Sequence, residues 1–92
     1  HLSVGTRRLY RRELESFMVF AVATCGRSHA TFVRWCLEPR AARVDRVLHA
    51  YVQALFDAGR PKSVANTAFC ALIAFYPGLR HALPWTRAAI KG

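Results

Sequence analysis

The sequence has few acidic residues, few lysines and no long apolar run. Only 5 Asp and Glu residues oppose 14 Lys and Arg residues, for a formal net charge of +9. The longest nearly apolar run, Phe17 to Ala23, is far shorter than the ~20 residues that cross a bilayer. Four arginines precede that run and no small-residue cleavage site follows it, so it is not laid out as a signal peptide. The sequence therefore predicts neither a membrane protein nor a secreted one.

Cysteine is scarce and unpatterned. Cys25, Cys36 and Cys70 are odd in number and form no Cys-x-x-Cys pair, so neither a disulfide framework nor a zinc site is expected. Cys25 and His29 stand four residues apart and could share one helical face, but no second pair completes a metal site. The three cysteines are interpreted as small core residues in a reducing, intracellular compartment. We expect no metal and no cofactor.

No catalytic motif appears either. Asp45 and Asp57 are twelve residues apart, and Glu13 and Glu15 diverge around a helix, so neither pair forms a carboxylate dyad. The four histidines are scattered, and no glycine-rich phosphate-binding loop is present. We therefore predict a chain without catalytic residues, which is not an enzyme by itself and has no small-molecule substrate.

The apolar residues that are present follow a helical period. Tyr10, Leu14, Phe17 and Ala21 fall on one face of a first helix, which starts with Ser3 or Thr6 as its N-cap and ends at Gly26. The next stretch, residues 27–40, is compatible with a short helix or with an extended segment. Pro39 stops it in either case.

Three more helices are predicted in the second half. One runs from about residue 42 to 58, ends at Gly59 and buries a stripe made of Val44, Val47, Leu48, Tyr51 and Leu55. The next opens near Ser63, whose side chain caps the amides of residues 65 or 66, and buries Val64, Ala68, Ala71, Leu72 and Phe75 before Pro77-Gly78 closes it. The last begins at Pro84 and reaches Ile90.

The whole of residues 1–92 is therefore predicted to be a single all-α domain, a compact orthogonal bundle of four to five helices. No strand pair or hairpin signal competes with this prediction. Trp35 and Trp85 are interpreted as core or lid residues rather than as stacking platforms.

The surplus of arginine favours an anionic partner. Arg7, Arg8, Arg11 and Arg12 lie within six residues at the start of the first helix, and only two acids are near them. Such a group fits contact with consecutive backbone phosphates of DNA. The alternative is a solvated charged face in which Glu15 pairs with Arg11 at i+4.

A second basic stretch begins at Arg60 and Lys62. It continues into small polar side chains on the first turn of a helix, an arrangement with which helices enter the major groove. The alternative is an ordinary capped helix start. With Arg87 and Lys91 of the last helix, the predicted DNA-contacting residues are Arg7, Arg8, Arg11, Arg12, Arg60, Lys62, Ser63, Asn66, Thr67, Arg87 and Lys91.

Several short motifs follow one another in a characteristic order: Thr6-x-x-x-Tyr10, Phe17 and Phe20, Val44-Asp45-x-x-Leu48-x-x-Tyr51-Val52-x-x-Leu55, Gly59-x-x-x-Ser63-x-x-Asn66, and Phe75-Tyr76-Pro77-Gly78-Leu79. From about Leu2 to Gly92, the chain resembles the N-terminal core-binding (SAM-like) domain of tyrosine recombinases and phage integrases, especially those of eukaryotic mobile elements. The stretch from Arg27 to Leu37 departs from the usual pattern, because it is more apolar and carries Trp35.

The resemblance implies a helical half-clamp around recombination-site duplex DNA, with other recombinase protomers as further partners. It also implies a separate catalytic domain, because no histidine here is followed by Arg in a His-x-x-Arg element and the three tyrosines match core positions of the family. A mobile-element recombinase of a eukaryote would act in the nucleus. The alternatives are a helical protein-interaction module and a decayed mobile-element fragment without activity.

Overall fold

The computed structural model describes residues 3–38 and 41–92, and within them it contains helices and no strand. Five α-helices and one 3₁₀ turn follow one another as α1 (Val4–Cys25), α2 (His29–Leu37), α3 (Ala41–Asp57), α4 (Lys62–Phe75), η1 (Pro77–Leu79) and α5 (Pro84–Lys91). The predicted all-α fold is confirmed.

Both ends of α1 follow from local residues. The hydroxyl oxygen of Ser3 accepts a hydrogen bond from the backbone N–H of Thr6 at 3.1 Å, so Ser3 is the N-cap. At the other end Gly26 has a φ of 67°, in the left-handed region where a residue without a Cβ is favoured. Phe17 and Ala21 are fully buried, as the spacing predicts.

The stretch after Gly26, for which helix and extended segment were both open, is a helix. Ser28 caps α2 by accepting a hydrogen bond from the backbone N–H of Thr31 at 3.1 Å. Phe32 and Cys36, four residues apart, turn into the core. The predicted stop at Pro39 lies outside the described residues.

The loop from α3 to α4 confirms one prediction and corrects another. Gly59, with φ of 78°, follows α3, and its N–H and that of Arg60 donate to the carbonyls of Phe56 and Leu55, the Schellman pattern. Ser63, however, does not cap α4, because the helix already begins at Lys62 and Pro61 occupies the cap position without a side-chain hydrogen bond. The fixed φ of proline suits that entry.

The buried face of α4 also differs from the predicted one. Phe75 is 40% exposed, whereas Phe69, which the predicted stripe omitted, is buried together with Ala65 and Ala68. The prediction of Phe75 is wrong because α4 ends at that residue, and its last turn lies at the edge of the core.

The start of α5 is held by a residue from another helix. Pro84 is its first residue, as predicted, but the preceding Leu83 offers no side-chain cap. The buried carboxylate of Asp45 on α3 accepts hydrogen bonds from the backbone N–H groups of Trp85 and Thr86 at 2.9 and 3.0 Å. The ring of Trp85 is 59% exposed, so of its two interpretations the core residue is wrong and the lid residue stays a prediction.

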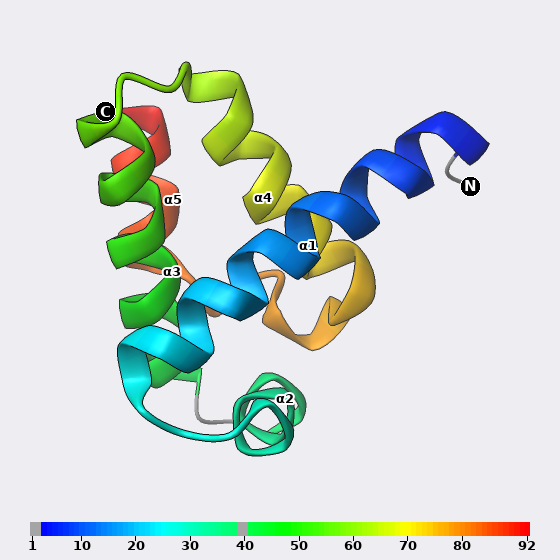
Figure 1. Ribbon diagram of the computed structural model, residues 1–92, viewed down its shortest axis with the longest axis vertical. Helices are drawn as coiled ribbons and strands as arrows, with labels where there is room; N and C mark the ends of the chain where they lie inside the picture. Colours follow the sequence, from blue (N-terminus) through cyan, green and yellow to red (C-terminus); the bar gives the residue numbers. More distant parts are fainter. Residues whose placement is uncertain (1–2, 39–40) are drawn as a thin grey trace.

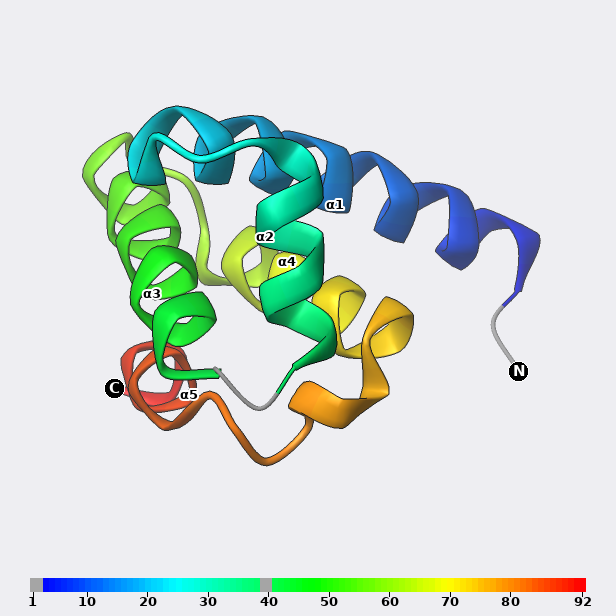
Figure 2. The same ribbon diagram turned by 90° about the horizontal axis from the view of Figure 1, so that it is seen from below.

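The helices cross steeply around one core. Figure 1 shows α2 end on and α3 lengthwise, so these consecutive helices run in clearly different directions. The N-terminal half of α1 extends beyond the other helices in both views (Figures 1 and 2), and Val4 on it is 72% exposed. The largest fully buried side chains belong to Phe17, Phe32, Leu48, Leu72, Leu79 and Leu83.

Candidate nucleic-acid interface

The four arginines of the first predicted cluster all lie on the projecting half of α1. Arg7, Arg8, Arg11 and Arg12 are exposed, whereas Tyr10 among them is half-buried. At 100° per residue, Arg8 and Arg12 point away from the core and Arg7 and Arg11 lie on one flank. We call these four residues the arm arginines.

The arm arginines are not neutralised within the protein. None of them has an ion pair or a side-chain hydrogen bond with any described residue, and the alternative pairing of Arg11 with Glu15 is not formed. Glu13, the other acidic residue near the arm, is half-buried. Burial raises the pKa of Tyr51, and the negative charge of Glu13 raises it further. The arm therefore carries an uncompensated positive charge.

Three residues of the second predicted stretch and Lys91 of the last helix meet at the start of α4. Lys62, Ser63 and Asn66 line a hollow of about 520 Å³ together with Ile90 and Lys91 from the end of α5. The ammonium group of Lys62 donates to the backbone carbonyl of Lys91 at 3.2 Å, which joins the two helix ends. We call Lys62, Ser63, Asn66 and Lys91 the polar corner.

Three other predicted contact residues lie outside the polar corner: Thr67, Arg87 and Arg60. The hydroxyl of Thr67 donates to the carbonyl of Ser63 at 2.8 Å, so it is used within α4. The guanidinium of Arg87 lies over the ring of Phe69, 5.0 Å from its centroid, and donates to the carbonyl of Arg80. Arg60 is exposed, and its charge partly offsets the raised pKa of Tyr51.

The arm and the polar corner lie on opposite sides of the molecule. The chain's N-terminus and C-terminus mark these two sides in Figures 1 and 2. The Cα trace measures 31 × 28 × 23 Å along its principal axes. One duplex that contacts both groups therefore has to follow the surface of the domain from one side to the other.

The structure contains a third group of arginines that no sequence pattern predicted. Arg27, Arg43 and Arg46 line one pocket together with Trp35 near the C-terminal end of α1. These residues come from a loop and two helices, so no local motif contains them. Only their spatial proximity identifies the group.

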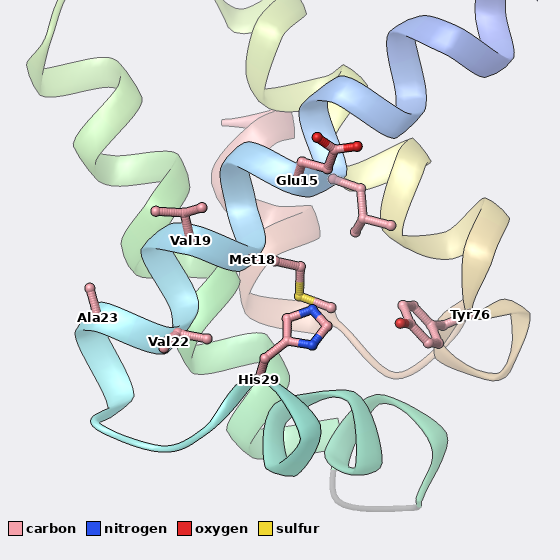
Figure 3. Close-up of a pocket in the computed structure, with 8 residues that line it drawn as sticks. Glu15, Met18, Val19, Val22, Ala23, His29 and Tyr76 are labelled. Atoms are coloured by element: carbon pink, nitrogen blue, oxygen red, sulfur yellow. The ribbon is translucent and has the colours of Figure 1, made fainter.

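An apolar groove of about 710 Å³ runs along α1. Figure 3 shows Met18, Val19 and Val22 of α1 on one side, His29 of α2 below, and Tyr76 from the segment after α4 across from them. Val19 is 72% exposed. Burial raises the pKa of the Tyr76 phenol, with a further increase from Cys36.

Within residues 3–38 and 41–92 the structure contains no cluster of three or more His, Cys, Asp or Glu side chains positioned to hold a metal ion. None of the described helices combines the length and the hydrophobicity that crossing a bilayer demands. No protein-family model matches the chain, and no curated protein or solved structure is significantly similar to it.

Proposed function

We propose that this chain is a non-catalytic DNA-binding module that clamps duplex DNA, as the core-binding domain of a tyrosine recombinase or phage integrase does at its recombination site. In this proposal a separate domain supplies the chemistry, and neighbouring protomers are further partners. Such a module acts inside the cell, and in the nucleus for a eukaryotic mobile element.

The observation that carries the proposal is the arm. Four guanidinium groups lie on two exposed sides of a helix that extends away from the body, and no described residue pairs with them. Guanidinium groups donate in planar forks that match phosphate oxygens, and they keep their charge at every physiological pH. The positive end of the α1 dipole lies at the same tip.

The polar corner supplies the second contact. It presents a lysine, a hydroxyl and an amide from the first two turns of α4. Lysine and serine are suited to phosphate, and the amide of Asn66 can donate and accept at an adenine edge. With the arm, the corner would give the duplex two separate contacts with the domain.

The test is the salt dependence of DNA affinity. If the domain neutralises about four to six phosphates, log K should fall with log salt concentration at a slope near −4 to −5. Fluorescence anisotropy of a labelled duplex, titrated at several chloride concentrations, measures this slope. A slope near zero would contradict the proposal, because phosphate contact always releases counterions.

A helical protein-interaction module is the second candidate, and the apolar groove favours it. An exposed Val19 beside Met18 and Val22 is the kind of surface that packs against a partner helix. The two functions differ in what disrupts them. Val19→Glu should weaken protein association and leave the DNA affinity of the monomer almost unchanged, whereas arm substitutions should do the opposite.

A further inference from the structure

Three arginines converge on one pocket at the end of the molecule away from the arm. The pocket has a volume of about 380 Å³ and is lined by Arg27, Arg43 and Arg46 around Trp35 and Cys25. Arg27 follows α1, Trp35 belongs to α2, and Arg43 and Arg46 belong to α3. The pocket is therefore built by three segments and depends on the folded chain.

The backbone explains how the three arginines come to line one pocket. Arg43 and Arg46 are three residues apart, so they share one face of α3. The left-handed turn at Gly26 ends α1 and redirects the chain, and Arg27 is the residue immediately after it. A substitution with a Cβ at Gly26 would disturb this turn.

One of the three arginines is already positioned. The guanidinium carbon of Arg43 lies 4.8 Å from the centroid of the Trp35 ring, within the range of a cation–π contact. Trp35 is in turn packed against the buried Phe32, with ring centroids 6.0 Å apart. A group held in this way loses little conformational freedom when it binds a ligand.

No acidic side chain lines this pocket. Asp45 stands between Arg43 and Arg46 in the sequence, but its carboxylate accepts hydrogen bonds from the start of α5. In the described part of the chain, the three guanidinium groups have no ion pair and no hydrogen bond to a protein acceptor. Three like charges around one hollow repel each other, and a bound anion would remove that repulsion.

We propose that this pocket binds a phosphate ester. Three guanidinium groups offer planar, paired donors to the oxygens of a group that carries up to two negative charges. The pocket is larger than a bare phosphate group, so it has room for part of the organic substituent. The phosphate can come from a free phosphorylated metabolite or from the backbone of a DNA strand.

Trp35 makes the proposal measurable. The chain has 2 tryptophans, so Trp85→Phe leaves Trp35 as the sole reporter inside the pocket. Inorganic phosphate and a short duplex are titrated separately into this protein at constant ionic strength, set with chloride. We expect a saturable change in Trp35 emission with at least one of the two. Saturation by phosphate identifies a site for the isolated group, and saturation by the duplex alone assigns the phosphate to a DNA backbone.

Two variants in the Trp85→Phe background test the assignment. Arg43→Gln with Arg46→Gln keeps the side-chain stems and should weaken binding by about tenfold or more. Arg34→Gln with Arg80→Gln, two exposed arginines outside the pocket, is the control for the same loss of charge. Circular dichroism verifies that each variant is folded. Arg43→Lys is a second check, because it keeps the charge and removes the planar fork.

The proposal is overturned if neither probe gives a saturable change, or if Arg34→Gln with Arg80→Gln reduces binding as much as the pocket pair does. It does not rest on the proposed DNA clamp. Arg8→Ala with Arg12→Ala should leave phosphate binding at Trp35 unchanged even if it abolishes duplex binding at the arm, so the two proposals fail separately.

Discussion

The carboxylate of Asp45 accepts hydrogen bonds from both the backbone N–H and the hydroxyl of Thr86, at 3.0 and 2.7 Å. Both residues are buried. The hydroxyl of Thr86 also lies 3.2 Å from the backbone carbonyl of Asp45. A carboxylate on α3 therefore acts as the N-cap of α5, where the positive end of the helix dipole stabilises its charge.

Asp45→Ala should destabilise the fold by about 2–4 kcal/mol, because it removes the acceptor and leaves buried donors of α5 without partners. For a domain of this size, a loss of 1 kcal/mol lowers Tm by roughly 4–8 °C. Urea and thermal unfolding followed by circular dichroism give both quantities.

The matched control is Asp57→Ala at the exposed end of the same helix. It removes the same charge without touching α5, and it should change stability by less than about 0.5 kcal/mol. Equal effects of the two substitutions would mean that Asp45 matters only through net charge.

The helix ends of this fold could be predicted wherever a single residue determines them. Gly26, Gly59 and Pro84 act through their own backbone preferences, and the structure confirms all three. The apolar stripe of the first helix could be predicted for a similar reason, because it follows from the spacing of residues within one helix. The prediction of Ser63 as the cap is wrong because Pro61, two residues earlier, is also compatible with the cap position.

The tertiary contacts could not be predicted in the same way. The cap of α5 joins residues more than forty positions apart, and nothing near Pro84 indicates that Asp45 reaches it. The pocket of Arg27, Arg43 and Arg46 depends equally on how α1 and α3 cross. The arm arginines, by contrast, are adjacent in the sequence, so their grouping was evident without a structure.

The buried thiol of Cys36 should make stability fall at high pH. Burial raises its pKa from 9.0 to about 12, so above pH 9 the unfolded chain loses this proton while the folded chain retains it. The contribution of the protonated Cys36 thiol to the stability of the fold is fully present below pH 9 and is lost as the pH rises toward 12. The free energy of unfolding should decrease by up to about 1.4 kcal/mol per pH unit from this group.

The interval just above pH 9 isolates Cys36 best, because the tyrosines, whose ordinary pKa is 10.0, titrate later. Urea unfolding at several pH values from about 8 to 10 measures the slope. Cys36→Ala should be less stable at neutral pH and have a flatter pH profile. A profile identical to that of the wild type would assign the pH dependence to another group.

Replacing Arg8 and Arg12 together by Ala should weaken binding to all duplexes alike and reduce the magnitude of the salt slope by about two. These side chains point away from the core and have no described partner, so stability should change little. Anisotropy titrations with two unrelated duplex sequences, each at several salt concentrations, measure both effects.

The control is a pair of exposed arginines outside both proposed DNA-contact groups. Arg34→Ala with Arg80→Ala removes the same charge from α2 and from the turn after η1, outside the arm and the polar corner. It should reduce affinity only through the weaker long-range field, with little change in slope. If both pairs lower the slope equally, the DNA is held by diffuse charge rather than by the arm.

Asn66→Ala tests whether α4 enters the major groove. Asn66 is exposed at the polar corner, and Thr67, not Asn66, makes the local hydrogen bond of that turn. If its amide contacts an adenine, the substitution should cost roughly 1–3 kcal/mol on a preferred site and much less on random DNA. Selection of bound duplexes from a random pool identifies that site, and titrations of both DNAs then give the difference.

Gln53→Ala provides the matched loss of an exposed amide, on α3 and outside the residues that line the corner, and should change neither affinity. The decisive comparison is with the arm. If Asn66→Ala leaves both affinities at the wild-type value while the Arg8 and Arg12 pair abolishes binding, α4 does not read bases. The domain would then hold DNA by its backbone alone, since long cations on an exposed helix sense charge and not base identity. In the proposed function, a separate domain would then have to recognise the sequence.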